Sequence, residues 1–163
     1  MVQVRVAGIA VDAAGDHVIL LKPLDALPGE GRILPIWIGA QEATSILLAV
    51  EGAEAPRPLA HDLMASLLTT LGADVTQVEV TAIRDGTFFA AITLAADRMT
   101  VVDARPSDAI ALASRTSAPI FVADDVLAEA GIVDITGDDD DAEENVEEFK
   151  RFLDDVDPDD FRE

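Results

Sequence analysis

The chain contains no cysteine and no tyrosine, and it has a single tryptophan among its 163 residues. Without cysteine it can form no disulfide framework, thiolate zinc site, iron–sulfur cluster or cysteine nucleophile. No apolar run approaches the ~20 residues of a membrane span, and the N-terminal residues lack the basic segment and long apolar run of a signal peptide. These absences predict a cytoplasmic protein that does not enter a membrane.

Basic residues are also scarce. Lysine and arginine total 11 against 32 aspartates and glutamates, so the formal net charge is −21. This balance argues against a basic platform for nucleic acid and against binding to an anionic membrane surface. The charge is uneven, because residues 134–163 hold 15 acids and only 3 bases.

The charge distribution predicts one domain over residues 1–133 and an acidic tail over residues 134–163. The four adjacent aspartates Asp138–Asp141 repel one another and should stay solvated. Beyond them, apolar residues recur at three- and four-residue steps, which predicts a short amphipathic helix at about residues 142–156. The favoured interpretation is that this helix docks on the body or frays. The alternative is that it binds a partner.

Two sequence matches indicate an internal duplication. Gln3–Ile9 resembles Gln77–Ile83, and Ile38–Ala49 resembles Val102–Ala113 in the same order. We therefore expect residues 2–71 and 75–130 to be related units of three strands and two helices.

The local patterns predict an α+β fold. In the first half we expect strands at 2–11, 17–22 and 32–38, a helix at 40–50 and a second helix ended by Gly72. In the second half we expect strands at 75–84, 87–95, 100–103 and 120–122, and helices at 106–114 and 125–130. Asp85-Gly86 predicts a two-residue hairpin turn, and Pro35 predicts an edge strand or a bulge.

Four segments along the chain carry distinctive residues. They are Leu34-Pro35-Ile36-Trp37-Ile38-Gly39 with Glu42-Ala43, Arg57-Pro58-Leu59-Ala60-His61-Asp62-Leu63, Gly86-Thr87-Phe88-Phe89-Ala90, and Asp103-Ala104-Arg105-Pro106-Ser107-Asp108-Ala109-Ile110-Ala111-Leu112-Ala113. These segments resemble signatures of the bifunctional nuclease family, in the order in which the family carries them. Glu148–Leu153 and Asp157–Phe161 also resemble the tail of some members. The resemblance implies a compact duplicated α+β domain, a homodimer or higher oligomer, and cleavage of DNA or RNA.

Phosphodiester hydrolysis commonly uses Mg²⁺ or Mn²⁺ held by oxygen ligands, and we expect one of these ions and no organic cofactor. The plausible carboxylates for the metal and for catalysis are Asp103, Asp108 and Glu42, and His61 is a candidate general base. The candidates for binding a substrate phosphate are Arg105, Arg57, Arg115 and Ser107.

Structural roles compete with each catalytic assignment. Asp108 falls at the third position of a helix that begins after Arg105, where an acid complements the helix dipole, and Glu42 does the same after Gly39. No metal or nucleotide motif supports an enzyme, and the acidic body repels phosphates. The rival hypothesis is a non-catalytic oligomeric module that binds a protein or a small ligand. A nuclease requires the candidate acids or His61 to converge beside an arginine, whereas the module requires only an apolar groove or an exposed interface.

Overall fold

The computed structural model describes residues 1–27, 29–134, 154–155 and 161, and its strands form one sheet. The strands are β1 (Val2–Val11), β2 (His17–Pro23), β3 (Arg32–Ile38), β4 (Asp74–Arg84), β5 (Thr87–Ala95), β6 (Met99–Ala104), β7 (Ile120–Val122) and β8 (Ile132–Val133). Their order across the sheet is β6-β5-β4-β7-β1-β2-β3-β8. The sheet is mixed, because β7 pairs parallel with β4 and antiparallel with β1.

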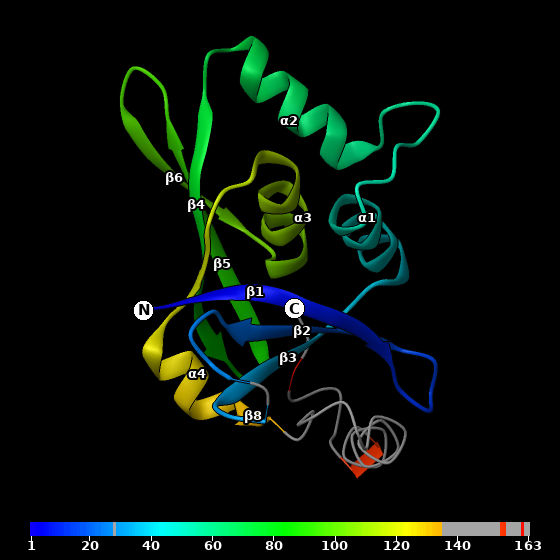
Figure 1. The fold of residues 1–163 in the computed structure, drawn as a ribbon. Coiled ribbons are helices and arrows are strands. Elements are labelled where there is room, and N and C mark those ends of the chain that lie inside the picture. The colour runs from blue at the N-terminus through cyan, green and yellow to red at the C-terminus, as the bar shows by residue number, and fades with distance from the viewer. Residues whose placement is uncertain (28, 135–153, 156–160, 162–163) are drawn as a thin grey trace.

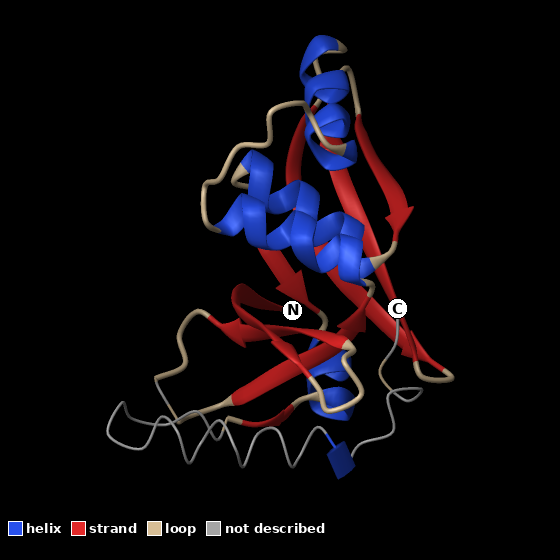
Figure 2. Ribbon diagram, turned by 90° about the vertical axis from the view of Figure 1, so that its right-hand side faces the viewer, coloured by secondary structure: helices blue, strands red, loops and turns tan. Residues whose placement is uncertain are grey.

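The helices are α1 (Ala40–Val50), α2 (Ala60–Thr70), α3 (Pro106–Thr116) and α4 (Asp124–Ala130). The first three form one group, in which α3 contacts both α1 and α2 and also packs on β4 and β5 (Figure 1). The short α4 lies apart from this group, against β3 and β4. Figure 2 shows the strong twist of the sheet beneath the helices. Among the described residues, no helix is long and apolar enough to cross a membrane.

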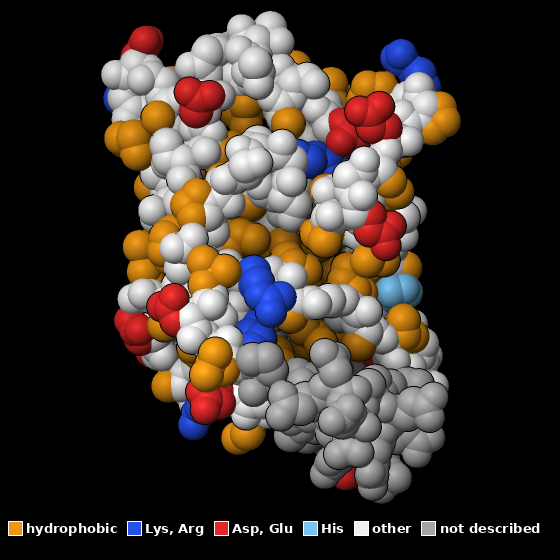
Figure 3. Space-filling view, in the orientation of Figure 1, with side chains coloured by type: hydrophobic (Ala, Val, Ile, Leu, Met, Phe, Trp, Pro, Cys, Tyr) orange, Lys and Arg blue, Asp and Glu red, His pale blue; other side chains and the backbone are white. Residues whose placement is uncertain are grey.

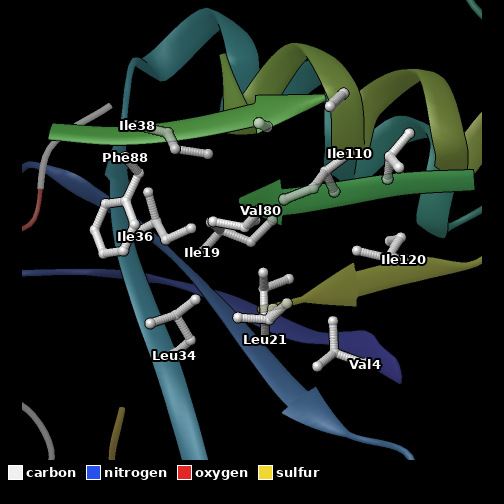
Figure 4. Close-up of a cluster of buried hydrophobic side chains, with 14 of the residues drawn as sticks. Val4, Ile19, Leu21, Leu34, Ile36, Ile38, Val80, Phe88, Ile110 and Ile120 are labelled. Carbon is white, nitrogen blue, oxygen red and sulfur yellow. The ribbon is translucent and has the colours of Figure 1, made fainter. Parts of the chain in front are cut away.

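The main hydrophobic core joins the two halves of the chain. Its side chains come from β1 to β5, β7 and the helices α1, α3 and α4, and they point toward one another in the close-up of Figure 4. Ile19, Leu21, Leu34 and Ile36 on β2 and β3 are fully buried, as is Ile110 on α3. The halves are therefore not independent domains, because one apolar interior holds both.

The strand β2 is buried on both of its faces. Its alternate residues Ile19 and Leu21 face the main core, whereas Val18 and Leu20 join a second cluster with Ile33 and Trp37. This explains why β2 reads as a continuous apolar run instead of an alternating one.

The edge of β3 is covered by a residue close to the C-terminus. The strand β8 pairs with Arg32 and Ile33, and beyond it the backbone N–H of Trp37 donates a 2.9 Å hydrogen bond to the carbonyl oxygen of Phe161. The rings of Trp37 and Phe161 pack with centroids 5.8 Å apart. Pro35 lies on β3 between these two contacts and pairs with Leu20 of β2. The predicted edge strand is matched only in part, because β3 lies between β2 and β8 in the sheet, but β8 pairs only with Arg32 and Ile33.

The α+β class and most predicted elements are confirmed. The predicted bounds of the elements at 2–11, 32–38, 40–50, 87–95 and 120–122 match the structure, and Asp85 and Gly86 form a tight turn with positive φ values of 50° and 74°. The two-residue strand β8 was not predicted.

The predicted superposition of residues 2–71 on 75–130 stays a prediction. Both halves begin with three antiparallel strands, but β7 separates the two helices of the second half. Of the predicted tail helix at about 142–156, only residues 154–155 are described, and both are helical. The run Asp138–Asp141 lies outside the described residues.

A buried ion pair connects β2 to the end of the domain. The ammonium group of Lys22 contacts the carboxylate of Asp134, and their side chains are only 7% and 0% exposed. The backbone N–H of Asp134 also donates a 3.1 Å hydrogen bond to the carbonyl oxygen of Gly31. The predicted boundary after residue 133 stays a prediction, but these contacts mean that any truncation should keep Asp134.

We expect Asp134→Asn to destabilise the protein by about 3 kcal/mol, because it leaves the buried charge of Lys22 without a counter-ion. Replacing both partners, as Lys22→Met with Asp134→Leu, should recover most of that loss, since no buried charge remains. Urea unfolding measures both effects, with the exposed Asp97→Asn as a control. Equal stability of Asp134→Asn and the control would show that the pair contributes nothing.

We expect Phe161→Ala to shift the fluorescence emission of the protein to longer wavelength. Trp37 is the only tryptophan, is 3% exposed, and would lose part of its cover. The free energy of unfolding should fall by about 1–2 kcal/mol, less than the ~3–5 kcal/mol for a fully buried phenylalanine. The half-buried Phe89, which packs under Arg84, provides the control Phe89→Ala. Unchanged emission from Phe161→Ala would contradict the packing of Phe161 on Trp37.

Candidate functional site

A pocket of about 670 Å³ lies where the first turns of α1, α2 and α3 meet. Its wall combines apolar side chains with a small number of polar and charged groups, as ligand sites commonly do. The lining residues are Ala40, Gln41, Glu42, Thr44, Ser45, Leu59, Ala60, His61, Met64, Arg105 and Asp108.

The three helices begin in the same way. The residues before their first turns, Gly39, Leu59 and Arg105, have extended backbones, and none of their side chains caps the helix by a hydrogen bond. Each helix instead carries an acid at its third position, which complements the positive end of the helix dipole. The predicted positions of Glu42 and Asp108 in their helices are confirmed.

Arg105 connects the acids of α1 and α3. Its Nε donates a 2.8 Å hydrogen bond to Oδ2 of Asp108, and one terminal nitrogen donates to Oδ1 of Asp108 at 3.1 Å and to Oε1 of Glu42 at 3.0 Å. The Arg105 side chain is 53% exposed, whereas the side chains of Asp108 and Glu42 are 27% and 20% exposed. The guanidinium is therefore oriented by two carboxylates and still faces solvent at the pocket.

His61 is held on both ring nitrogens. Its Nδ1 lies 2.7 Å from Oγ of Ser45, and its Nε2 lies 2.9 Å from Oδ1 of Asp108. Both His61 and Ser45 are 6% exposed. A hydrogen-bonded chain therefore runs from α1 through the imidazole of α2 to the carboxylate of α3.

Gly39 leaves room for the carboxylate of Glu42. A Cβ added at Gly39 would lie 2.2 Å from Oε2 of Glu42. The Glu42 side chain therefore turns back over the start of its own helix, in the direction that lets it meet Arg105.

Asp108 is ionised at neutral pH. Burial raises the pKa of this carboxyl, but the hydrogen bonds from Arg105 and His61 outweigh that effect and hold the pKa below the ordinary value of 3.8. The carboxylate is therefore an anion that accepts hydrogen bonds from both neighbours.

Arg115 stabilises the helices behind the pocket and does not line it. Its Nε donates a 2.6 Å hydrogen bond to Asp62, and its other nitrogens donate to the carbonyl oxygens of Ala111 and Ser45. Asp62 also accepts a hydrogen bond from the backbone N–H of Leu59. This arrangement connects all three helices and fixes the positions of Ser45 and His61 relative to each other.

The structure brings four of the predicted residues together, and they are Glu42, His61, Arg105 and Asp108. The other candidates lie outside the pocket. Asp103 is exposed on β6, Arg57 is exposed in the loop before α2, Ser107 is fully buried, and Arg115 bonds Asp62.

Ser45 lies in the pocket but was not among the predicted residues. In sequence, it is a small residue in an alanine-rich helix, and its contact with His61 depends on the packing of α2 on α1. The only available signal was its spacing of three residues from Glu42, which puts both side chains near one face of the helix.

The pocket acids do not fit the predicted divalent cation in this arrangement. In the described part of the chain, no group of three histidine, aspartate or glutamate side chains is placed to hold a metal ion. The guanidinium of Arg105 occupies the place between Glu42 and Asp108 that a cation would need.

Comparison with known proteins identifies the family of the chain. The model of the family described as "Bifunctional nuclease domain" matches residues 24–134. The chain belongs to the bifunctional nuclease domain family. The family match ends at Asp134, the buried partner of Lys22, and it includes every residue of the pocket.

Some relatives of the chain are named as uncharacterized proteins, and others are named as nucleases. Two uncharacterized proteins from two strains of Mycobacterium tuberculosis are 44% identical over 99% of both chains. Proteins named "Bifunctional nuclease 1" in two subspecies of Oryza sativa are 29% identical, over 68% of this chain and 34% of their own length.

The pairing of Asp62 predicts a pH-dependent contribution to stability. The hydrogen bond from Arg115, and then that from Leu59, lower the pKa of Asp62 below 3.8. Because the folded pKa is lower than the unfolded one, the contribution is complete above about pH 4 and is lost as the pH falls through the folded pKa.

We therefore expect Asp62→Asn to cost about 1 kcal/mol near neutral pH, since the pair is partly open to water, and progressively less as the pH falls below about 4. Urea unfolding of both proteins across this range measures the difference, with Asp97→Asn as the exposed control. A difference that grows as the pH falls would have the wrong sign and would refute the assignment.

Proposed function

We propose that the pocket binds and hydrolyses phosphodiester bonds of DNA or RNA. The observation that carries this proposal is the convergence of Arg105, His61 and Asp108 in one pocket beside Glu42. A nuclease requires this convergence, whereas a binding module does not. The nuclease names of the rice relatives support the same reaction class.

Arg105 is the group that recognises the phosphate. Its side chain is exposed by about half, and a phosphate that replaced Glu42 would meet the terminal N–H donor that now bonds Glu42. The first turns of α1, α2 and α3 add the positive ends of their dipoles at the same pocket. These donors act in direct contact with the phosphate, whereas the repulsion from the acidic body is screened over ~8 Å at physiological salt.

His61 and Asp108 supply proton transfer. An imidazole paired with a carboxylate accepts a proton readily, because the carboxylate stabilises the imidazolium that forms. The apolar lining from Leu59 and Met64 limits water around these groups.

The predicted requirement for Mg²⁺ or Mn²⁺ is a separate question for experiment. Glu42 and Asp108 would hold a cation only after Arg105 moved away from them. In the proposed reaction the side chains alone bind the phosphate and move the protons.

A homodimer or other non-catalytic assembly is the second candidate function, and the outer face of α2 favours it. Leu63, Leu67 and Leu71 are 53%, 52% and 78% exposed at four-residue steps, and they form an apolar stripe. On the face shown in Figure 3, hydrophobic side chains also occupy much of the middle, and acidic groups lie mainly toward its outline. A stripe without charge is a surface that two acidic copies can share without mutual repulsion.

We expect Asp108→Asn and Arg105→Lys each to slow cleavage of a single-stranded substrate at least tenfold, or ~1.4 kcal/mol of barrier. The first removes the anion that pairs with His61, and the second removes the guanidinium donors for phosphate. Asp97 and Arg98 are adjacent, exposed residues outside the pocket, so Asp97→Asn and Arg98→Lys are the matched controls.

Cleavage should be measured with EDTA, with Mg²⁺ and with Mn²⁺ over a range of salt concentrations, and thermal unfolding should confirm that each variant folds. Cleavage that persists in EDTA supports a reaction carried by the side chains alone, and strict dependence on Mn²⁺ or Mg²⁺ would show that Arg105 gives way to a cation. If the pure wild type cleaves nothing under any of these conditions, the nuclease proposal is wrong and the assembly module becomes the better account.

A further inference from the structure

Ser45 differs from the other helical hydroxyl groups near it. Ser114 on α3 and Thr44 on α1 each donate a hydrogen bond to the carbonyl oxygen four residues earlier, at 2.8 and 2.9 Å. This is the usual bond of a hydroxyl within a helix. Ser45 instead bonds the imidazole of His61, which belongs to another helix.

The neighbours of His61 determine the direction of that bond. The carboxylate of Asp108 can only accept, so Nε2 of His61 carries a hydrogen and donates it to Asp108. In the neutral imidazole Nδ1 is then an acceptor, and the hydroxyl of Ser45 donates to it. A serine that donates to a histidine backed by an aspartate is the arrangement that activates a hydroxyl as a nucleophile.

Ser45 is buried, but it lies on the wall of the pocket. Its hydroxyl is therefore shielded from bulk water and reached through the same space that Arg105 and the three helix starts line. Those groups match a tetrahedral phosphorus centre with several partly negative oxygens better than a neutral carboxylic ester.

We propose that Ser45 is a nucleophile that attacks phosphorus esters in this pocket and forms a covalent phosphoseryl intermediate. The choice of substrate class rests on the proposed function, whereas the reactivity of the hydroxyl rests on the chain from Ser45 through His61 to Asp108. His61 is the base for Ser45 in this scheme, and Asp108 is a positioning residue that acts through His61.

Water is the only reactant that this scheme needs besides the phosphodiester. Oγ of Ser45 forms a bond to phosphorus while its proton moves to Nδ1 of His61, and the bond from phosphorus to the leaving alkoxide oxygen breaks. His61 returns the proton to that oxygen, and the first product leaves as an alcohol. Water then attacks phosphorus and gives a proton to His61, while the bond from phosphorus to Oγ of Ser45 breaks. His61 passes the proton to Oγ, which regenerates the serine hydroxyl, and the phosphate monoester leaves.

The test is covalent labelling of the full-length protein with an alkyl fluorophosphonate, which reacts with an activated serine and releases fluoride. We expect mass spectrometry to place the phosphonyl group on Ser45 in the wild type. Ser45→Ala should abolish the label, and Ser114→Ala should keep it, because Ser114 bonds only the helix backbone among the described contacts. Asp108→Asn should slow labelling at least tenfold.

Cleavage of a single-stranded oligonucleotide by the same proteins separates this inference from the proposed function. If the wild type carries the label on Ser45 and Ser45→Ala cleaves at least 100-fold more slowly, both the nucleophile and the nuclease are supported. Labelled Ser45 in a wild type that cleaves no nucleic acid supports the nucleophile and overturns the nuclease. A wild type that cleaves but carries no label on Ser45, or a Ser45→Ala variant that cleaves as fast as Ser114→Ala, overturns the nucleophile and leaves the nuclease standing.

Discussion

The carboxylate of Asp108 is the group on which the pocket depends. It accepts hydrogen bonds from Arg105 on one side and from His61 on the other, and it therefore orients both the proposed phosphate-binding group and the proposed base. The hydrogen bonds hold its pKa low in spite of burial, so the charge that orients them persists at neutral pH. An acid at the third position of a helix is common for structural reasons, and here the same placement puts the acid between two other helices. The structural and functional interpretations of Asp108 are therefore compatible.

Local sequence patterns were sufficient to predict most strands and helices, and the segment of the pocket that carries Arg105 and Asp108. Alternation, turn residues and helix starts are properties of neighbouring residues, which is why β1, β3 and α1 were predicted with their observed bounds. The convergence of Glu42, His61 and Asp108 depends instead on the packing of α3 against α1 and α2. Ser45 is the clearest example, because its hydroxyl acquires a role only when the imidazole of another helix lies beside it.

The end of the chain shows a second limit of local patterns. Asp134 and Phe161 belong to a strongly acidic stretch, where charge density alone predicts solvated residues. Asp134 is nevertheless buried against Lys22, and Phe161 packs on Trp37 at the edge of β3. A lysine inside β2 has no local explanation, and its partner lies 112 residues further along the chain. Such a pair is visible only in three dimensions.

A nuclease with a strongly negative net charge must still bind a negatively charged phosphate. The ion pairs of Arg105 with Glu42 and Asp108 suggest how it does so. The bond between Arg105 and Glu42 is partly open to water, and pairs of this kind contribute only about 0–1 kcal/mol. A phosphate can therefore take the place of Glu42 at little cost, because it offers Arg105 equivalent oxygens. The two bonds from Arg105 to Asp108 would remain and keep the guanidinium aimed at the pocket. Charges elsewhere on the body act through salt-containing water and weaken beyond ~8 Å, whereas these donors act in direct contact. In the proposed function, the local geometry at Arg105 therefore outweighs the repulsion from the net charge.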